Sequence, residues 1–145
     1  MKLSTRSRYG LRILMQIAIE NSYGRLAQGK VISEKQEISE PYLEQIMITL
    51  RSSGLVRTVR GCNGGYQLNR NPEQVTVLEV IELFEGVLKI VDCEPGKKPC
   101  SRLEKCITAT VWKKLSDALR KSAASITLKE IIDQRPGSTG NEYFI

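Results

Sequence analysis

Apolar residues recur at helical spacing in three stretches of the first half of the chain. The first stretch runs from about Leu3 to Asn21, and a shorter one covers Gln28 to Lys35. A third helix is predicted after Ser39, a good N-cap with Pro41 in the following turn, and Gly54 suits its end. The positions predicted to be buried are Leu11, Ile13, Leu14, Ile17, Ala18, Val31, Ile32, Tyr42, Leu43, Ile46, Met47 and Leu50.

After Gly54 the pattern changes from helical spacing to alternation. Residues 55–59 alternate between two faces, and a second apolar stretch at 66–68 follows a glycine-rich turn. Asn63-Gly64 predicts a tight hairpin turn in which both residues take a positive φ. Three helices followed by a hairpin predict a winged helix-turn-helix, that is, a mainly α fold with a small β-hairpin wing. The alternative is a generic small α+β domain.

The second half of the chain is predicted to be helical on both sides of a loop at 88–105 that is rich in Lys, Pro, Gly and Cys. Thr76 opens a helix that ends at Gly86, and its inward positions are Val77, Val80, Ile81 and Phe84. A long helix is predicted from about residue 107 to residue 124, and the capping box Thr127–Glu130 begins a short one after it. The long helix carries a narrow stripe made of Val111, Leu115, Ala118, Leu119 and Ser122.

A stripe this narrow is typical of a seam between two helices. We therefore predict a long C-terminal dimerisation helix and a homodimer, which suits a two-fold operator, although the helix would alternatively fold back on its own core. The predicted parts are a winged helix-turn-helix domain at 1–86, a cysteine-rich loop at 87–106, the dimerisation and C-terminal helices at 107–135 and a tail at 136–145.

The net charge of +6 belongs entirely to the N-terminal half. Residues 1–70 carry 11 Lys and Arg against 5 Asp and Glu, whereas residues 71–145 carry 11 of each. This excess favours double-stranded DNA as the partner. No stretch approaches the ~20 apolar residues of a membrane span, and the N-terminus is too polar for a signal peptide, so a cytoplasmic location is expected. The chain has no histidine and no visible nucleophile–base pair, so we do not expect an enzyme.

In a helix-turn-helix, the N-terminal residues of the second helix lie nearest the bases. Gln45 there can bond an adenine edge, and Glu44 can accept a hydrogen bond from a cytosine amine. Arg60, at the base of the wing, is placed to enter the minor groove or bind phosphate. The predicted DNA-binding residues are Ser39, Tyr42, Glu44, Gln45 and Arg60, with Arg6, Arg8 and Arg51 as lesser phosphate contacts.

Cys93, Cys100 and Cys106 share one loop at a C-x6-C-x5-C spacing. Cytoplasmic thiols stay reduced, so these cysteines are candidate metal ligands or redox sensors rather than disulfides. Three thiolates suit zinc or an iron–sulfur cluster, and the spacing alone does not separate the two; idle thiols are the third possibility. Cys62 lies on the predicted wing tip and is expected to be exposed and not a ligand.

Three stretches of the chain resemble the Rrf2 family of bacterial winged-helix regulators. They are Leu-Ser-Thr-Arg-Ser-Arg-Tyr-Gly-Leu-Arg at 3–12, Ile-Ser-Glu-Pro-Tyr-Leu-Glu-Gln-Ile at 38–46, and Gly-Leu-Val-Arg-Thr-Val-Arg-Gly-Cys-Asn-Gly-Gly-Tyr-Gln-Leu at 54–68. The resemblance extends to Ile-Thr-Leu-Lys-Glu-Ile-Ile at 126–132, and within the family it is greatest to the regulators of iron–sulfur cluster assembly.

This resemblance implies a dimeric, iron–sulfur-cluster-binding regulator, a repressor, whose ligands are Cys93, Cys100 and Cys106. It favours a 2Fe–2S cluster and leaves 4Fe–4S open. The family's histidine ligand falls at Ala109, and the acidic ligand of another branch falls at Arg8, so the fourth ligand is not identified. Candidates for it are Asp92, Glu94, Glu104, a group from the second subunit, or an exogenous thiol.

The expected function is therefore control of cluster-assembly or iron and cysteine metabolism genes by a cluster-binding regulator. One alternative keeps DNA binding but makes the signal nitric oxide or thiol oxidation. A second alternative is a zinc-stabilised DNA-binding or interaction module without sensory chemistry.

Overall fold

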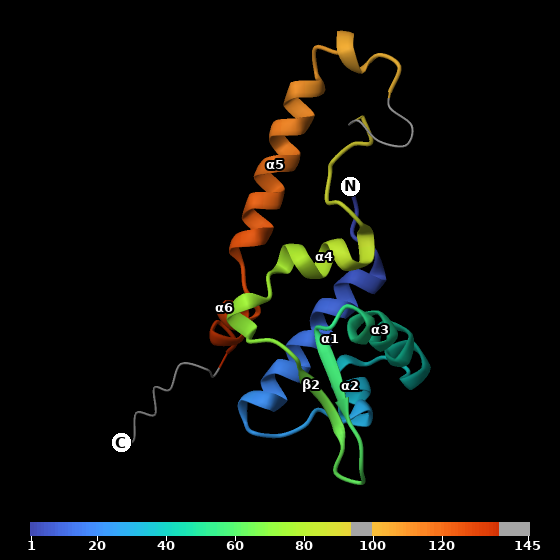
Figure 1. Cartoon of the computed structure of the whole chain (residues 1–145), viewed down its shortest axis with the longest axis vertical. Coiled ribbons are helices and arrows are strands. Elements are labelled where there is room, and N and C mark those ends of the chain that lie inside the picture. Colours follow the sequence, from blue (N-terminus) through green and yellow to red (C-terminus); the bar gives the residue numbers. More distant parts are fainter. Residues whose placement is uncertain (94–99, 137–145) are drawn as a thin grey trace, which may run out of the picture.

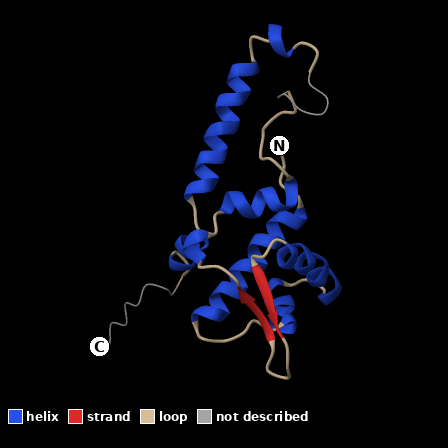
Figure 2. Cartoon of the chain, in the orientation of Figure 1, coloured by secondary structure: helices blue, strands red, loops and turns tan. Residues whose placement is uncertain are grey.

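Helices dominate the computed structural model, which describes residues 1–93 and 100–136, and one short hairpin lies against them (Figures 1 and 2). This confirms the predicted mainly α fold with a small wing. The α-helices in the described part are α1 (Thr5–Ser22), α2 (Gly29–Gln36), α3 (Glu40–Ser52), α4 (Val77–Glu85), α5 (Ala109–Ser125) and α6 (Leu128–Asp133). The strands are β1 (Val56–Val59) and β2 (Gly65–Leu68), and the 3-10 turns are η1 (Pro72–Gln74) and η2 (Leu103–Lys105).

The helices begin where the sequence places capping side chains. Ser4 caps α1 by accepting from the Ser7 N–H at 3.2 Å, and Ser39 caps α3 by accepting from the Tyr42 N–H at 3.3 Å. Thr76 and Thr127 cap α4 and α6 in the same way. Gly54, which follows the C-cap of α3, has a φ of 78°. These contacts confirm the predicted starts of α3, α4 and α6.

α1 runs through the middle of the body, and the main core forms around it (Figure 1). Helices α2, α3 and α4, the hairpin and α6 all contribute to this core. Gly10 lies so close to α4 that a Cβ there would collide with the Phe84 ring, so α1 and α4 pack tightly. The fully or almost fully buried side chains of this core include Ile13, Leu14, Ile17, Ile32, Leu43, Ile46, Met47, Leu50, Leu55, Val75, Val80 and Leu128.

The hairpin pairs in antiparallel register from Val56–Leu68 to Val59–Gly65. Its turn differs from the prediction, because the positive φ falls on Gly61, at 124°, and not on Asn63 or Gly64. The connection spans residues 60–64, so it is a longer loop and not a two-residue turn. The strand predicted at 55–59 is confirmed as β1, and Leu55 and Val56 are both buried where the chain leaves α3.

β2 is joined to a second segment besides β1. The backbone N–H of Ala27 donates to the Tyr66 carbonyl at 3.0 Å, and the Tyr66 N–H donates back at 2.8 Å. Asn21, near the end of α1, accepts from the Leu68 N–H at 2.9 Å. The wing is therefore fixed to the residues that precede α2 and to α1, not only to its own partner strand.

α5 stands away from the body, and its N-terminal end lies at the opposite end of the molecule from the hairpin (Figure 1). Only its C-terminal half packs, through a second small cluster that contains Ile81, Leu88 and Ala123, with Leu119 against it. Of the predicted stripe, Val111 and Leu115 are each 47% exposed in the single chain, whereas Leu119 packs against this cluster. In the described part of the chain, no helix is both long and apolar enough to cross a membrane.

Candidate functional site

The exposed face of α3 carries the side chains that the sequence predicted to read DNA. Glu44 and Gln45 are exposed on it, and Ser39 is exposed at its start. Tyr42 is half-buried, because its ring packs edge-on against Tyr9 with centroids 5.8 Å apart. A helix face with polar groups pointing outward and a firmly buried opposite side is what groove binding requires.

Arg60 lies at the beginning of the wing loop and is exposed, as expected for a side chain that meets the sugar–phosphate backbone. Next to it on the hairpin, the Arg57 guanidinium donates to the Gln67 side chain at 2.8 Å across the two strands. Arg6, Arg8 and Arg51 are exposed as well. The side chains predicted to touch DNA thus fall on α3, the wing and the start of α1.

Glu44 is held by a residue that the sequence analysis did not select. The Tyr66 hydroxyl donates to Glu44 Oε1 at 2.7 Å, and Arg51 Nη2 lies 3.8 Å from Glu44 Oε2. Burial of the phenol, together with its bond to the carboxylate, raises the pKa of Tyr66 to about 12. The wing strand β2 therefore contacts α3, the helix predicted to bind the major groove, through the bond between Tyr66 and Glu44. No pattern in the sequence predicts this contact.

A buried carboxylate joins the first two helices below this face. Glu20 is 5% exposed and accepts from Lys35 at 2.7 Å and from Arg25 at 2.9 Å. Its bond with Lys35 is the main cause that lowers the pKa of the Glu20 carboxyl; Arg25 adds to the effect and burial opposes it. Gln16 donates to the same carboxylate at 2.9 Å. This network fixes α2, and with it the start of α3, against α1.

The predicted ligand cysteines all have free thiols, and Cys106 lies just before α5 begins. Cys93 and Cys106 are partly exposed, and Cys100 is exposed, as is Cys62 on the wing loop. The Sγ of Cys106 lies 3.3 Å from the Thr108 hydroxyl, just before α5 begins. Hydrogen bonding to Thr108 is the main cause that lowers the pKa of the Cys106 thiol. The lowered pKa increases the thiolate fraction of Cys106, just before the first turn of α5.

These thiols fit a soft metal or iron–sulfur cluster in kind, but they are not gathered into a finished site. Cys100 and Cys106 line one hollow of about 650 Å³, with Arg102 and Glu104 at its edge. Within residues 1–93 and 100–136, no three His, Cys, Asp or Glu side chains lie close enough together to hold a metal ion. Among the candidates for a fourth ligand, Asp92 is ion-paired with Lys89 at 2.9 Å, and Glu94 lies outside the described residues.

The segment that leads to Cys93 is attached to both α4 and α5. The Glu82 side chain, on α4, accepts from the Leu88 N–H at 2.9 Å and from the Arg120 guanidinium on α5. Ser116, which is 2% exposed, accepts from the Ile90 N–H at 3.1 Å. We call these five residues, Glu82, Leu88, Ile90, Ser116 and Arg120, the α4–α5 clamp. It connects the thiol loop to the winged domain.

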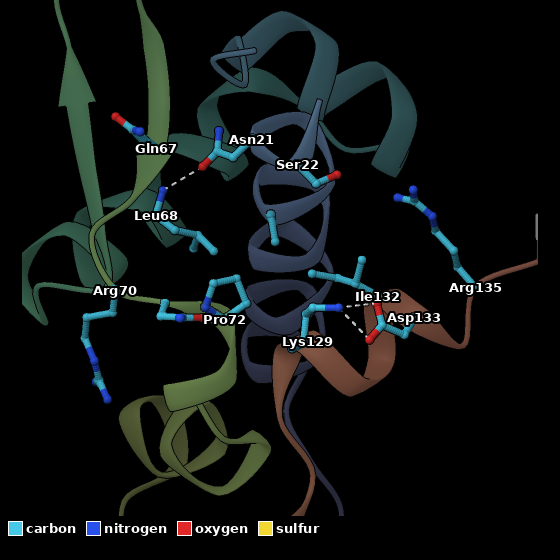
Figure 3. Close-up of a pocket in the computed structure, with 12 residues that line it drawn as sticks. Asn21, Ser22, Gln67, Leu68, Arg70, Pro72, Lys129, Ile132, Asp133 and Arg135 are labelled. Atoms are coloured by element: carbon cyan, nitrogen blue, oxygen red, sulfur yellow. Dashed lines mark hydrogen bonds and ion pairs between the residues drawn. The ribbon is translucent and has the colours of Figure 1, made fainter. Parts of the chain in front are cut away.

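A separate hollow of about 470 Å³ lies between α1, β2, η1 and α6 (Figure 3). Leu68, Pro72 and Ile132 give it an apolar floor, and Figure 3 shows Lys129 reaching Asp133 at its edge. None of the residues predicted to bind DNA or a cluster lines it.

Comparisons with known proteins agree with this geometry. The family model Rrf2, described as an iron-dependent transcriptional regulator, matches residues 3–134. The HTH-type transcriptional regulator IscR of Pectobacterium atrosepticum is 34% identical over 135 residues, 93% of this chain and 81% of that protein.

Two solved structures extend the agreement to the fold. CymR, the global cysteine regulator of B. subtilis, has a TM-score of 0.77 at 31% identity and covers 94% of this chain and 99% of its own. IscR of T. potens has a TM-score of 0.73 at 34% identity and covers 92% of this chain and 87% of its own. These relatives are transcriptional regulators, not enzymes, and they share the winged-helix fold.

Proposed function

This chain belongs to the Rrf2 family of transcriptional regulators, and from that premise we propose that it is a repressor whose grip on operator DNA depends on an iron–sulfur cluster held by Cys93, Cys100 and Cys106. The target genes are proposed to serve cluster assembly or iron and cysteine metabolism. The observation that carries the proposal is the set of three free thiols in one loop, and the lowered pKa of the Cys106 thiol adds to it.

The DNA-binding half of the proposal rests on the face of α3 and on the wing. Ser39, Tyr42, Glu44 and Gln45 would meet the major groove, and Arg60 the backbone or the minor groove. Their exposure on a helix whose other side is buried supports this role. We propose 1–86 as the DNA-binding domain on the same grounds.

The other half of the proposal concerns pairing of two chains. Val111 and Leu115 leave an apolar strip on the outward side of α5, and Ile107 before it is 92% exposed. Apolar groups on a protruding helix are typical of an interface between copies. A homodimer formed there would set two α3 helices at a fixed separation, as a two-fold operator requires.

The link between thiols and DNA would run through the α4–α5 clamp. When bound, a cluster supplies iron sites that need thiolate ligands, so Cys93 and Cys106 would have to approach each other. Cys93 follows Ile90, which is bonded to Ser116 of α5, and Cys106 precedes the first turn of the same helix. A change in their separation would therefore shift α5 against α4, and thus one winged head against the other.

The test begins with protein purified without oxygen. We expect iron and acid-labile sulfide in the wild-type protein and their loss in Cys93→Ala, Cys100→Ala and Cys106→Ala. Cys62→Ala is the matched control, since its thiol is exposed on the wing, and it should keep both. Operator affinity, measured by fluorescence anisotropy at one salt concentration, should differ between cluster-bound and cluster-free protein.

Two results would contradict the proposal. Wild-type protein that holds no sulfide even after anaerobic reconstitution would remove the cluster from it. Equal operator affinity with and without the cluster would remove the control of DNA binding.

A second function is supported by the likeness to CymR, which is named a global cysteine regulator. In this version the signal is oxidation of the Cys106 thiol by peroxide, or its nitrosylation by nitric oxide with dioxygen as the electron acceptor, and the lowered pKa of Cys106 increases the reactive thiolate fraction. Exposing metal-free protein to peroxide and to nitric oxide in turn would separate the two functions. Loss of operator binding by metal-free protein favours the thiol signal. Stoichiometric zinc without sulfide would favour a zinc-stabilised module instead.

A further inference from the structure

We propose that Tyr66, on the wing strand, is a positioning residue that fixes the Glu44 carboxylate of α3 and thereby sets which base the reading helix prefers. The inference rests on the proposed DNA-binding function and adds to it a residue that does not itself face the groove. It concerns the choice between operators and not the strength of phosphate binding.

Tyr66 has little freedom of its own. Its residue is 8% exposed, its backbone N–H and carbonyl both bond Ala27, at 2.8 and 3.0 Å, and it lies opposite Thr58 in the hairpin register. Its ring lies beside the start of α2, where a Cβ on Gly29 would come within 3.6 Å of it. The phenolic oxygen of Tyr66 is therefore held at one position beside α3.

The Glu44 side chain, unlike that of Tyr66, is not restrained by burial, because it is 52% exposed. An exposed glutamate on a helix ordinarily samples several rotamers. Here Oε1 accepts the Tyr66 hydroxyl at 2.7 Å, while Arg51 lies 3.8 Å from Oε2. Since the phenol stays protonated far above neutral pH, it remains a donor under physiological conditions. One rotamer of Glu44 is thus favoured while its outer side stays open to a ligand.

A held carboxylate discriminates among bases more sharply than a mobile one. It can accept a hydrogen bond from a cytosine amine at its own position, and it meets the acceptor groups of the other bases with repulsion. A carboxylate free to rotate would turn away from unfavourable bases and so escape that penalty. Removal of the Tyr66 hydroxyl should therefore relax base preference, and it should do so by improving binding to disfavoured operators.

The experiment compares Tyr66→Phe, Glu44→Ala and the double variant in the full chain. Tyr66→Phe keeps the buried ring and removes one oxygen. Tyr23→Phe is the matched control, because Tyr23 is 60% exposed and its hydroxyl bonds Arg135 at 2.9 Å. The readout is the affinity ratio between the preferred operator and operators with a single base replaced, drawn from a randomised DNA pool at one salt concentration.

We expect Tyr66→Phe to reduce this ratio roughly five- to tenfold at the base position where Glu44→Ala reduces it, a size typical of one lost base contact. The double variant should match Glu44→Ala alone, and Tyr23→Phe should match the wild type. An unchanged ratio in Tyr66→Phe, or a further effect of Tyr66→Phe when Glu44 is already replaced, would overturn the inference.

A measurement without DNA separates this inference from the proposed function. In urea unfolding, the effects of Tyr66→Phe and Glu44→Ala should be non-additive, since each removes the same hydrogen bond. Additive effects would overturn the positioning role. Wild-type protein that binds no DNA with sequence preference would instead overturn the proposed function, and the non-additive unfolding would still record the contact in the free chain.

Discussion

Replacing Glu82 tests the α4–α5 clamp with the fewest assumptions. Its Oε1 accepts two hydrogen bonds, from the Leu88 N–H and from the Arg120 guanidinium, so Glu82→Ala removes both bonds at once. Glu82→Gln is the matched variant, because the amide oxygen can still accept from Leu88 while the charge is lost. The pair of variants therefore separates the acceptor from the charge.

The expected cost follows from the burial of the groups that are left behind. Leu88 is 4% exposed, so its unpaired N–H would cost about 1 to 2 kcal/mol. The Glu82 and Arg120 side chains are 26% and 34% exposed, so the lost ion pair is partly screened and adds about 1 kcal/mol. We expect Glu82→Ala to lose about 2 to 3 kcal/mol and Glu82→Gln about 1 kcal/mol.

Urea unfolding measures this difference, and the single tryptophan makes the assay local. Trp112 lies on α5, so its fluorescence reports on the docking of that helix, whereas far-UV circular dichroism reports on all helices. In Glu82→Ala the fluorescence transition should move about 1 M lower and precede the circular-dichroism transition. Ser116→Ala, which removes the bond to Ile90, should move it less.

The reasoning would be refuted if Glu82→Ala unfolded within about 0.5 kcal/mol of the wild type, a change typical of an unimportant surface position. A Glu82→Gln variant as unstable as Glu82→Ala would also contradict this expectation. The glutamine oxygen that can still accept from the Leu88 N–H would then contribute no stability.

Three further predictions follow from contacts described above. Gly10→Ala should lower the free energy of unfolding by about 1 to 3 kcal/mol, because its methyl group displaces the Phe84 ring; an unchanged melting temperature would contradict the tight α1–α4 packing. Glu20→Gln should destabilise the protein by a constant amount at neutral pH. Because the folded-state pKa of Glu20 is lowered, that difference should shrink as the pH falls below the ordinary value of 4.5, and a pH-independent difference would count against the network. Leu115→Asp should give a monomer by light scattering with an unaltered far-UV spectrum, since Leu115 is 47% exposed; a persisting dimer would move the interface elsewhere.

The local signals in the sequence were sufficient for most of the fold. Caps such as Ser39 and Thr127 act within their own helix, so three or four neighbouring residues decide where it begins. The hairpin turn was predicted wrongly because Asn63-Gly64 favours a two-residue loop only when the strands reach it. Here β1 ends at Val59, and the loop bends at Gly61 instead. The choice between loop lengths depends on strand pairing, which a local pattern does not contain.

Contacts at the candidate site were less accessible to prediction. The exposed polar positions of α3 follow from helical periodicity, so Glu44 and Gln45 could be selected. The partner of Glu44 is 22 residues away, on a strand where tyrosine is unremarkable, and only the folded hairpin brings it close. The buried side of α5 was also missed, because Ser116 and Ala123 are small residues whose burial gives no apolar signal. For the thiols, spacing identifies candidate ligands, but their assembly depends on the fold and on what they bind.

The uneven packing of α5 has a consequence for motions on the timescale of hydrogen exchange. Between residues 109 and 115 no side chain is buried in the described chain, whereas Ser116 and Ala123 anchor the rest of the helix. Amide protons in the first two turns should then exchange with solvent through local fraying, while those of α1 exchange only when the whole chain opens. The start of α5, next to Cys106, should thus open locally at the lowest free energy, whereas the part of the molecule that carries α3 should open at the highest.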